Sequence, residues 1–85
     1  MATLIKADGT EKEVTPKSGN TFSLDELQIF VDGYIEMCTS TDNRWMVVNE
    51  EGKLKGLPVN EKATQLYGRD TLVGDILVCD KSQLD

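Results

Sequence analysis

Turn-forming residues interrupt this chain at short intervals, so each regular element that it forms must be short. The breaks fall at Asp8-Gly9, Pro16, Gly33, Glu51-Gly52 and Gly68. Asp-Gly supplies the positive φ angles of a tight primed turn, and proline lacks the N–H that a continuous element needs. The spacing predicts one small domain, residues 1–85, built from several short strands and helices.

Two segments of the sequence predict β-hairpins. Residues 2–7 and 10–15 flank the Asp8-Gly9 turn. In residues 34–50 apolar side chains recur with a period of two, and a two-residue turn at Thr41-Asp42 would place Met37 opposite Met46 and Ile35 opposite Val48 on the core face. The other face would then carry a mixed set of side chains: Tyr34, Glu36, Cys38, Trp45, Val47 and Asn49.

Capping signals predict two helices. Ser23 with Glu26 forms a capping box, Phe22 and Leu27 can form a hydrophobic staple, and Gly33 ends the helix. The apolar residues at helical spacing are Leu24, Leu27, Phe30 and Val31. A shorter helix begins after Asn60, runs to Tyr67 with Ala63, Leu66 and Tyr67 inward, and ends at Gly68.

The run LVGDILVC at residues 72–79 predicts a central strand covered on both faces. The expected order is therefore ββαββαβ, an α+β fold with a mainly antiparallel sheet and two short helices. We expect one core made of the following residues: Leu27, Phe30, Ile35, Met37, Met46, Val48, Ile76 and Val78.

Charge and composition restrict the possible partners. The chain carries 15 acidic and 9 basic residues, a net charge of −6, which disfavours nucleic acid and acidic membrane surfaces. No apolar run reaches the about 18 residues that span a bilayer. Cys38 and Cys79 lie far apart, and the N-terminus does not look like an export signal, so we expect a cytoplasmic protein with reduced thiols.

Catalytic chemistry has little support in the sequence. The chain has no histidine, and its two cysteines lack the spacing of a zinc site. No dinucleotide-binding or P-loop pattern is present. We therefore expect no metal, no cofactor and no enzymatic activity.

Two regions are candidates for ligand binding. Trp45 and Tyr34, with Val47 beside them, suit a planar ligand or a subunit interface, although a helix packed over Trp45 would make it a core residue. The second region is the segment VVNEEGKLKGLPVNEKAT, residues 47–64, whose candidate ligand contacts are Asn49, Lys53, Lys55 and Gly56, with Arg69 nearby. Solvated lysines and asparagines that serve turns and helix caps explain the same residues without a ligand.

Three stretches carry a resemblance to a known family: FSLDELQIFVDGYIEM, MVVNEEGKLKGLPVNEKAT and VGDILVC. In this pattern the chain resembles an uncharacterised family of small proteins encoded by bacteriophages, prophages and mobile elements. The sequence departs from the pattern at residues 38–42, the tip of the second hairpin. The resemblance covers almost the whole chain and implies a context without a reaction, since the family has no assigned activity.

The resemblance implies action on host machinery in the host cytosol. One hypothesis is a non-catalytic protein that sequesters a small anionic, nucleotide-derived defence signal, with Tyr34 or Trp45 stacking on the base and Lys53, Lys55 or Arg69 meeting phosphate. The alternative is an inhibitor that binds a host protein through its acidic surface. A domain this small has a modest core, so we also expect a homo-oligomer.

Overall fold

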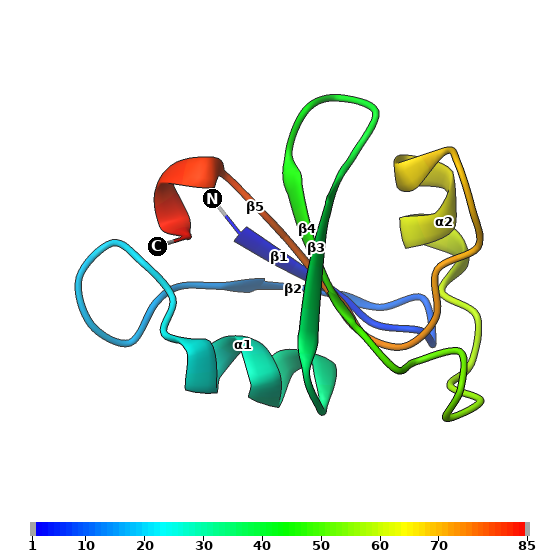
Figure 1. Ribbon diagram of the computed structural model, residues 1–85. Helices are drawn as coiled ribbons and strands as arrows, with labels where there is room; N and C mark the ends of the chain where they lie inside the picture. Colours follow the sequence, from blue (N-terminus) through cyan, green and yellow to red (C-terminus); the bar gives the residue numbers. More distant parts are fainter. Residues whose placement is uncertain (1, 85) are drawn as a thin grey trace.

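The computed structural model describes residues 2–84 and contains one five-stranded antiparallel sheet with a helix on each face (Figure 1). The elements are β1 (Ala2–Ile5), β2 (Glu11–Val14), α1 (Leu24–Val31), β3 (Ile35–Thr39), β4 (Trp45–Asn49), α2 (Glu61–Tyr67), β5 (Ile76–Cys79) and a short 3₁₀ turn, η1 (Lys81–Gln83). The expected α+β class and the order ββαββαβ are confirmed. No helix in residues 2–84 is long and apolar enough to cross a membrane.

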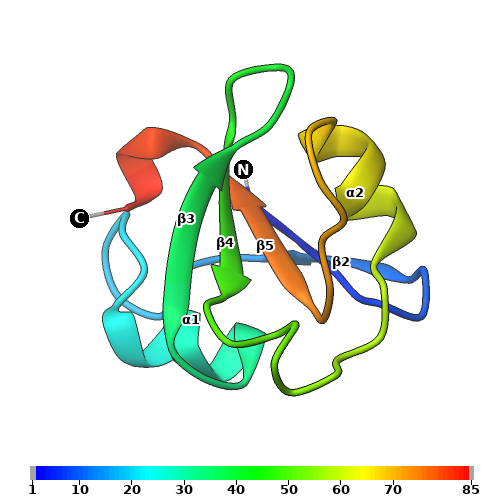
Figure 2. The ribbon, with the colours of Figure 1, turned by 45° about the vertical axis from the view of Figure 1, so that its right-hand side comes forward.

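The sheet joins two hairpins through the last strand. Its order is β2-β1-β5-β4-β3, so β5 pairs with β1 on one side and with β4 on the other (Figure 2). All four residues of β5 are buried, as the apolar run in the sequence predicts for a central strand. The edges of the sheet are β2 and β3.

The first helix forms as its capping signals predict. The Ser23 hydroxyl accepts from the Glu26 N–H, and the Glu26 carboxylate accepts from the Ser23 N–H, which completes the capping box. Phe22 and Leu27 are buried in one cluster, consistent with the hydrophobic staple. The helix ends at Val31, and the left-handed residue that follows is Asp32, at φ 60°, rather than Gly33.

The second helix also matches its prediction. The Asn60 side chain caps it by accepting from the Ala63 N–H, and Gly68 ends it at φ 77°. Ala63 is buried, while Leu66 and Tyr67 are partly buried against the same core. Helix α2 is thereby fixed on the sheet face opposite to α1 (Figure 1).

The predicted register of the second hairpin is wrong by one residue. Cys38, not Met37, pairs with Met46, and Glu36, not Ile35, pairs with Val48. The cause is a three-residue turn, in which the Asn43 N–H bonds to the Ser40 carbonyl and Asn43 adopts φ 66°. A type I turn closed by a left-handed residue adds one residue to the hairpin loop, and a one-residue shift exchanges the two faces of a strand.

The single predicted core is in fact two cores, one on each face of the sheet. The α1 face buries the following residues: Ala2, Phe22, Leu27, Val31, Val47, Leu77 and Cys79, with Phe30, Ile35 and Trp45 partly buried. The α2 face buries Ile5, Met46, Val48, Ala63, Leu72, Ile76 and Val78. Met37, which was expected in the core, is 40% exposed, and Leu24, one of the apolar residues at helical spacing, is 57% exposed. The mixed aromatic surface that the incorrect register predicted is therefore absent from the described residues. Val47 is buried, and Trp45 packs on the α1 side, as expected if a helix covers it.

Candidate functional site

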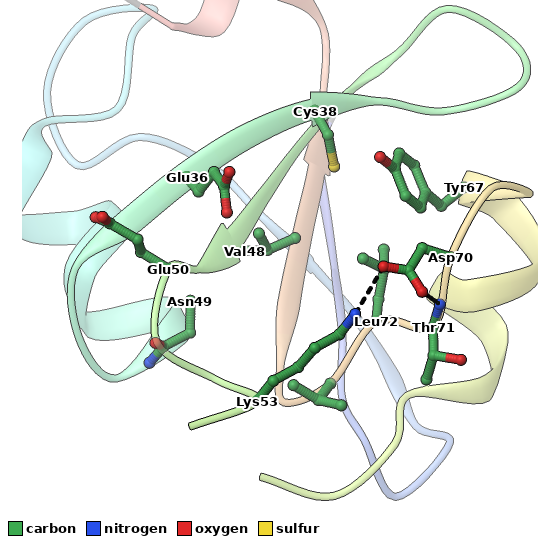
Figure 3. A pocket seen from close by; sticks show the side chains of 11 residues that line it. Glu36, Cys38, Val48, Asn49, Glu50, Lys53, Tyr67, Asp70, Thr71 and Leu72 are labelled. Atoms are coloured by element: carbon green, nitrogen blue, oxygen red, sulfur yellow. Dashed lines mark hydrogen bonds and ion pairs between the residues drawn. The ribbon is translucent and has the colours of Figure 1, made fainter. Parts of the chain in front are cut away.

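A cleft of about 240 Å³ opens on the α2 face, between the β3–β4 hairpin and the segment that links α2 to β5 (Figure 3). Tyr67, the last residue of α2, lines this cleft, so the cleft begins where the helical cover of the sheet ends. Val48, Leu72 and Val73 supply apolar lining. A small flat ligand would thus meet apolar side chains of the protein below it.

Polar side chains stand around this apolar lining. The Glu36 carboxylate turns toward the cleft, whereas that of Glu50 turns outward (Figure 3). Within residues 2–84, the Glu36 carboxylate makes no hydrogen bond or ion pair, whereas the Glu36 backbone pairs with Val48 in the sheet. The Cys38 thiol and the Tyr67 hydroxyl point toward each other at the far end of the cleft (Figure 3). The cleft thus offers one carboxylate, one phenol and one thiol.

An ion pair connects the two walls of the cleft. The Lys53 ammonium, on the loop after β4, donates to the Asp70 carboxylate at 2.7 Å. This hydrogen bond lowers the pKa of Asp70 below its usual value, and a second hydrogen bond, from the Thr71 N–H, lowers it further. Both side chains are more than half exposed, so the pair adds little to stability. A competing anion can therefore displace Asp70 from Lys53 at low cost.

Arg69 lies at the Tyr67 end of the cleft. Its guanidinium stacks 5.0 Å from the centre of the Tyr67 ring and donates to the Thr39 carbonyl and hydroxyl at 3.4 and 3.3 Å. These contacts place the guanidinium beside Tyr67, which lines the cleft. Of the sequence-predicted cations, Lys53 and Arg69 are thus the two near the cleft.

Asn49 borders the cleft but is used inside the protein. Its amide donates to the Val31 and Asp32 carbonyls at 2.9 and 3.1 Å, and its side-chain oxygen accepts from the Glu51 N–H at 2.8 Å. Both donors are occupied by the end of α1. Asn49 therefore holds α1 to the loop after β4, which is the turn chemistry that the sequence also allowed.

The remaining predicted site residues lie apart from the cleft. Trp45 is partly buried among the side chains packed under α1, and Tyr34 is 64% exposed just before β3. Lys55 reaches toward Gly33 at the end of α1. Gly56 adopts φ 68° with open space around it, so it serves a left-handed turn and no close approach of a neighbour.

Among the lining residues that sequence reasoning did not name as ligand contacts are Glu36, Cys38, Tyr67 and Asp70. Glu36 and Cys38 were predicted on the same mixed face of the second hairpin, because residues two apart in a strand point to the same side. Tyr67 was read only as a core residue of its helix. No local sequence pattern marks Asp70, because its contact with Lys53 joins two loops that are distant in the sequence.

The two thiols have weak nucleophilic character. Burial raises the pKa of Cys38, with the Glu36 charge adding to the effect and Arg69 opposing it. Burial, with the nearby Asp80 charge, raises the pKa of Cys79 to about 11. Since the thiolate is the reactive form, both groups are mainly thiols at neutral pH. Among residues 2–84, no group of three His, Cys, Asp or Glu side chains is placed to hold a metal ion.

Residues 1–84 match the model of a protein family described as a domain of unknown function, DUF3846. The chain belongs to this family. The match spans nearly the full sequence, in agreement with the resemblance to an uncharacterised family. No curated protein and no solved structure matches the chain. In this DUF3846 chain the cleft is the feature that bears most directly on function.

Proposed function

We propose that this protein is a non-catalytic binding module that sequesters a small nucleotide-like ligand in the β3–α2 cleft. The base ring lies on the apolar lining with its edge toward Glu36, and the phosphate lies outside, near Lys53 or Arg69. The observation that carries the proposal is one unpaired carboxylate that turns toward the apolar part of a cleft, with Lys53 on the cleft wall and Arg69 beside Tyr67.

The size of the cleft supports a ligand of which only one ring enters. Typical small-molecule pockets measure about 300–1,000 Å³, and this cleft measures about 240 Å³. A single base fills such a space, while a ribose and phosphate remain at the rim. The ligand is then held partly by groups outside the cleft.

The acidic character of the cleft supports recognition of donors on the base. A carboxylate accepts two hydrogen bonds, and the amino and imino groups of base edges are donors. Glu36 suits such an edge, whereas it would repel a phosphate placed deep in the cleft. The phosphate is expected at Lys53, because the Lys53 ammonium can leave Asp70 and bind a more highly charged anion instead.

The family resemblance supplies the biological part of the proposal. We take the protein to be phage-type, with a nucleotide-derived defence signal of the host cytosol as its ligand. Self-association belongs to the proposal as well, because an 85-residue chain has a modest core of its own. The second candidate is inhibition of a basic host protein, which the net charge of −6 favours.

The test combines a thermal shift with protection of Cys38. The protein is melted with a panel of mononucleotides and cyclic nucleotides, and a ligand at 100 times its Kd raises stability by about 2.7 kcal/mol. The same ligand slows alkylation of Cys38 by iodoacetamide, because the thiol lines the cleft. Cys79, which is fully buried, serves as the internal reference in the mass spectrum.

Matched variants locate the site. Glu36→Gln and Lys53→Ala are expected to abolish the thermal shift, whereas Lys55→Ala, on the same loop but away from the cleft, leaves it unchanged. A panel without any shift or protection would reject the nucleotide ligand. Capture of a basic host protein by the wild type, weakened by salt, would then favour the second candidate.

A further inference from the structure

Strand β3 presents backbone hydrogen-bonding groups that have no partner within the sheet. The Tyr34 carbonyl accepts from the Glu50 N–H, and the Ser40 N–H donates to the Arg44 carbonyl, both at 2.8 Å. Because an antiparallel strand alternates inward and outward groups, Ile35, Met37 and Thr39 point theirs away from β4. Figure 2 shows β3 at the outer edge of the sheet.

The two edges of the sheet differ in how they are protected. Edge β2 carries three exposed charged residues, Glu11, Lys12 and Glu13, which discourage pairing with another chain. Edge β3 carries one charge, Glu36, and its central residue, Met37, is 40% exposed. Neither proline nor lysine protects β3. Of the two edges, β3 is therefore the one suited to pairing.

We propose that two copies of the chain associate by antiparallel pairing of their β3 strands around a two-fold axis at Met37. This inference rests on the self-association in the proposed function and names its surface. Met37 pairs with Met37 of the second copy, and Ile35 pairs with Thr39 of the second copy. Two five-stranded sheets become one continuous sheet, and the outward groups of both β3 strands are satisfied.

The side chains agree with this register. Glu36 lies opposite Cys38 of the second copy, and the two Glu36 carboxylates are only diagonal neighbours, so no like charges stand directly opposite. The two exposed Met37 side chains meet on the α1 face. Arg69 already bonds the Thr39 carbonyl at 3.4 Å, and the second lone pair of that oxygen remains for the incoming N–H.

This pairing would extend the candidate site. Glu36 and Cys38 of the cleft lie on β3 itself, so β3 of the second copy continues the same face of the sheet. The two clefts then lie side by side across the axis, and each gains Cys38 of the second copy next to its Glu36. The part of a ligand that extends beyond one cleft would meet the second copy.

Light scattering on the full-length chain tests the association. The wild type is expected to be a dimer, and Met37→Lys is expected to raise the dimer dissociation constant at least on the order of tenfold, because it sets like charges opposite each other. The matched control is Ile29→Lys, an equally polar change at a residue of α1 that is 72% exposed, which should leave the dimer intact. A wild-type monomer at all accessible concentrations would overturn the proposal.

A cross-link tests the register separately. In a Cys38→Ser background, Met37→Cys places two thiols at a hydrogen-bonded antiparallel pair, where the Cα atoms lie about 5.5 Å apart, a separation that a disulfide spans. Diamide should link the copies within the dimer, whereas Ile29→Cys in the same background should stay unlinked. Efficient linking through Ile29→Cys, or a dimer that survives Met37→Lys, would place the interface elsewhere and refute the β3 pairing.

The two proposals fail in different ways. The nucleotide panel is repeated on Met37→Lys after its melting curve shows that it folds. A nucleotide-induced thermal shift in a chain that never dimerises would support ligand binding in the cleft and reject the β3 pairing. A β3-paired dimer without any nucleotide-induced shift would support the pairing and reject the nucleotide ligand. Binding of an extended host peptide to β3 of a monomeric wild type would also reject the pairing of copies.

Discussion

Two buried asparagines explain why Val-Asn-Glu occurs twice in this sequence, at residues 48–50 and 59–61. Asn60 donates to the Ile5 and Gly74 carbonyls and accepts from the Ala63 N–H. Asn49 does the same with the Val31 and Asp32 carbonyls and the Glu51 N–H. Each side chain bonds to three backbone groups and so ties its own segment to residues distant in the sequence. Their shared role is structural, since both amides are fully engaged.

Replacing Asn60 by Asp tests this role. The change keeps the size and the cap to Ala63, but it sets a carboxylate oxygen against two carbonyl oxygens that now accept at 2.8 and 2.9 Å. We expect a loss of at least about 2 kcal/mol in the free energy of unfolding, because two buried acceptors lose their donor. Urea unfolding measures it. Asn43→Asp, at an exposed turn position, is the control, and an equal loss there would contradict the role of Asn60.

Alkylation of Cys38 should depend on pH in a predictable way. Because burial raises its pKa, the thiolate fraction at pH 8 is smaller than in an unfolded cysteine, and it grows as the pH passes the ordinary value of 9.0. We expect iodoacetamide to alkylate Cys38 more slowly in the folded protein than in the urea-unfolded chain. The rate of alkylation in the folded protein should still rise with pH above pH 9. A rate that levels off below pH 8 would show instead a thiolate stabilised in the cleft.

Among the elements, the helices were predictable from sequence and the second hairpin was not. Helix α1 follows from Ser23, Glu26 and Phe22, which act over a single turn. The hairpin register depends on whether Asn43 takes a left-handed conformation, and the sequence Thr41-Asp42-Asn43 is compatible with loops of different lengths. One residue of difference then exchanged the faces of β3 relative to β4, whereas Trp45 is in the α1 core because α1 packs over its face of β4.

Asn43 provides a direct test of the turn. It adopts φ 66°, where asparagine and glycine are tolerated and a β-branched residue is strained. We expect Asn43→Gly to leave the melting temperature nearly unchanged and Asn43→Val to cost about 1–2 kcal/mol. Thermal melts of the two variants decide the matter, and equal stability for both would mean that the turn has another conformation.

Helix α1 offers a comparison between two leucines. Leu27 is buried beneath the helix, so Leu27→Ala should cost about 2–5 kcal/mol. Leu24 is 57% exposed on the same helix, and Leu24→Ala should change the free energy of unfolding by about 0.5 kcal/mol or less. Denaturant titrations compare them. Similar losses at both positions would mean that α1 docks on the sheet through a different side.

At the scale of the whole molecule, the cleft depends on contacts that no local pattern carries. Lys53 and Asp70 meet from two loops on either side of α2, and Glu36 joins them from β3. The sequence identified Lys53 and Arg69 as candidate contacts, and it placed Glu36 beside Cys38 through strand alternation. It could not place Tyr67 or Asp70, because their positions depend on how α2 packs on the sheet. The sequence predicted that the strand at residues 72–79 is covered on both faces, but not that the core residues divide into two clusters, one on each face.

The order of the strands in space differs from their order of synthesis. Strand β5 occupies the middle of the sheet, yet its residues leave the ribosome after both hairpins and both helices. Without β5 the two hairpins share no strand, and Ile5 and Met46 lack the central strand beside which they are buried. Apolar strands that wait unpaired are open to misassociation. This protein can therefore fold as one cooperative unit only once β5 is free to pair with both β1 and β4.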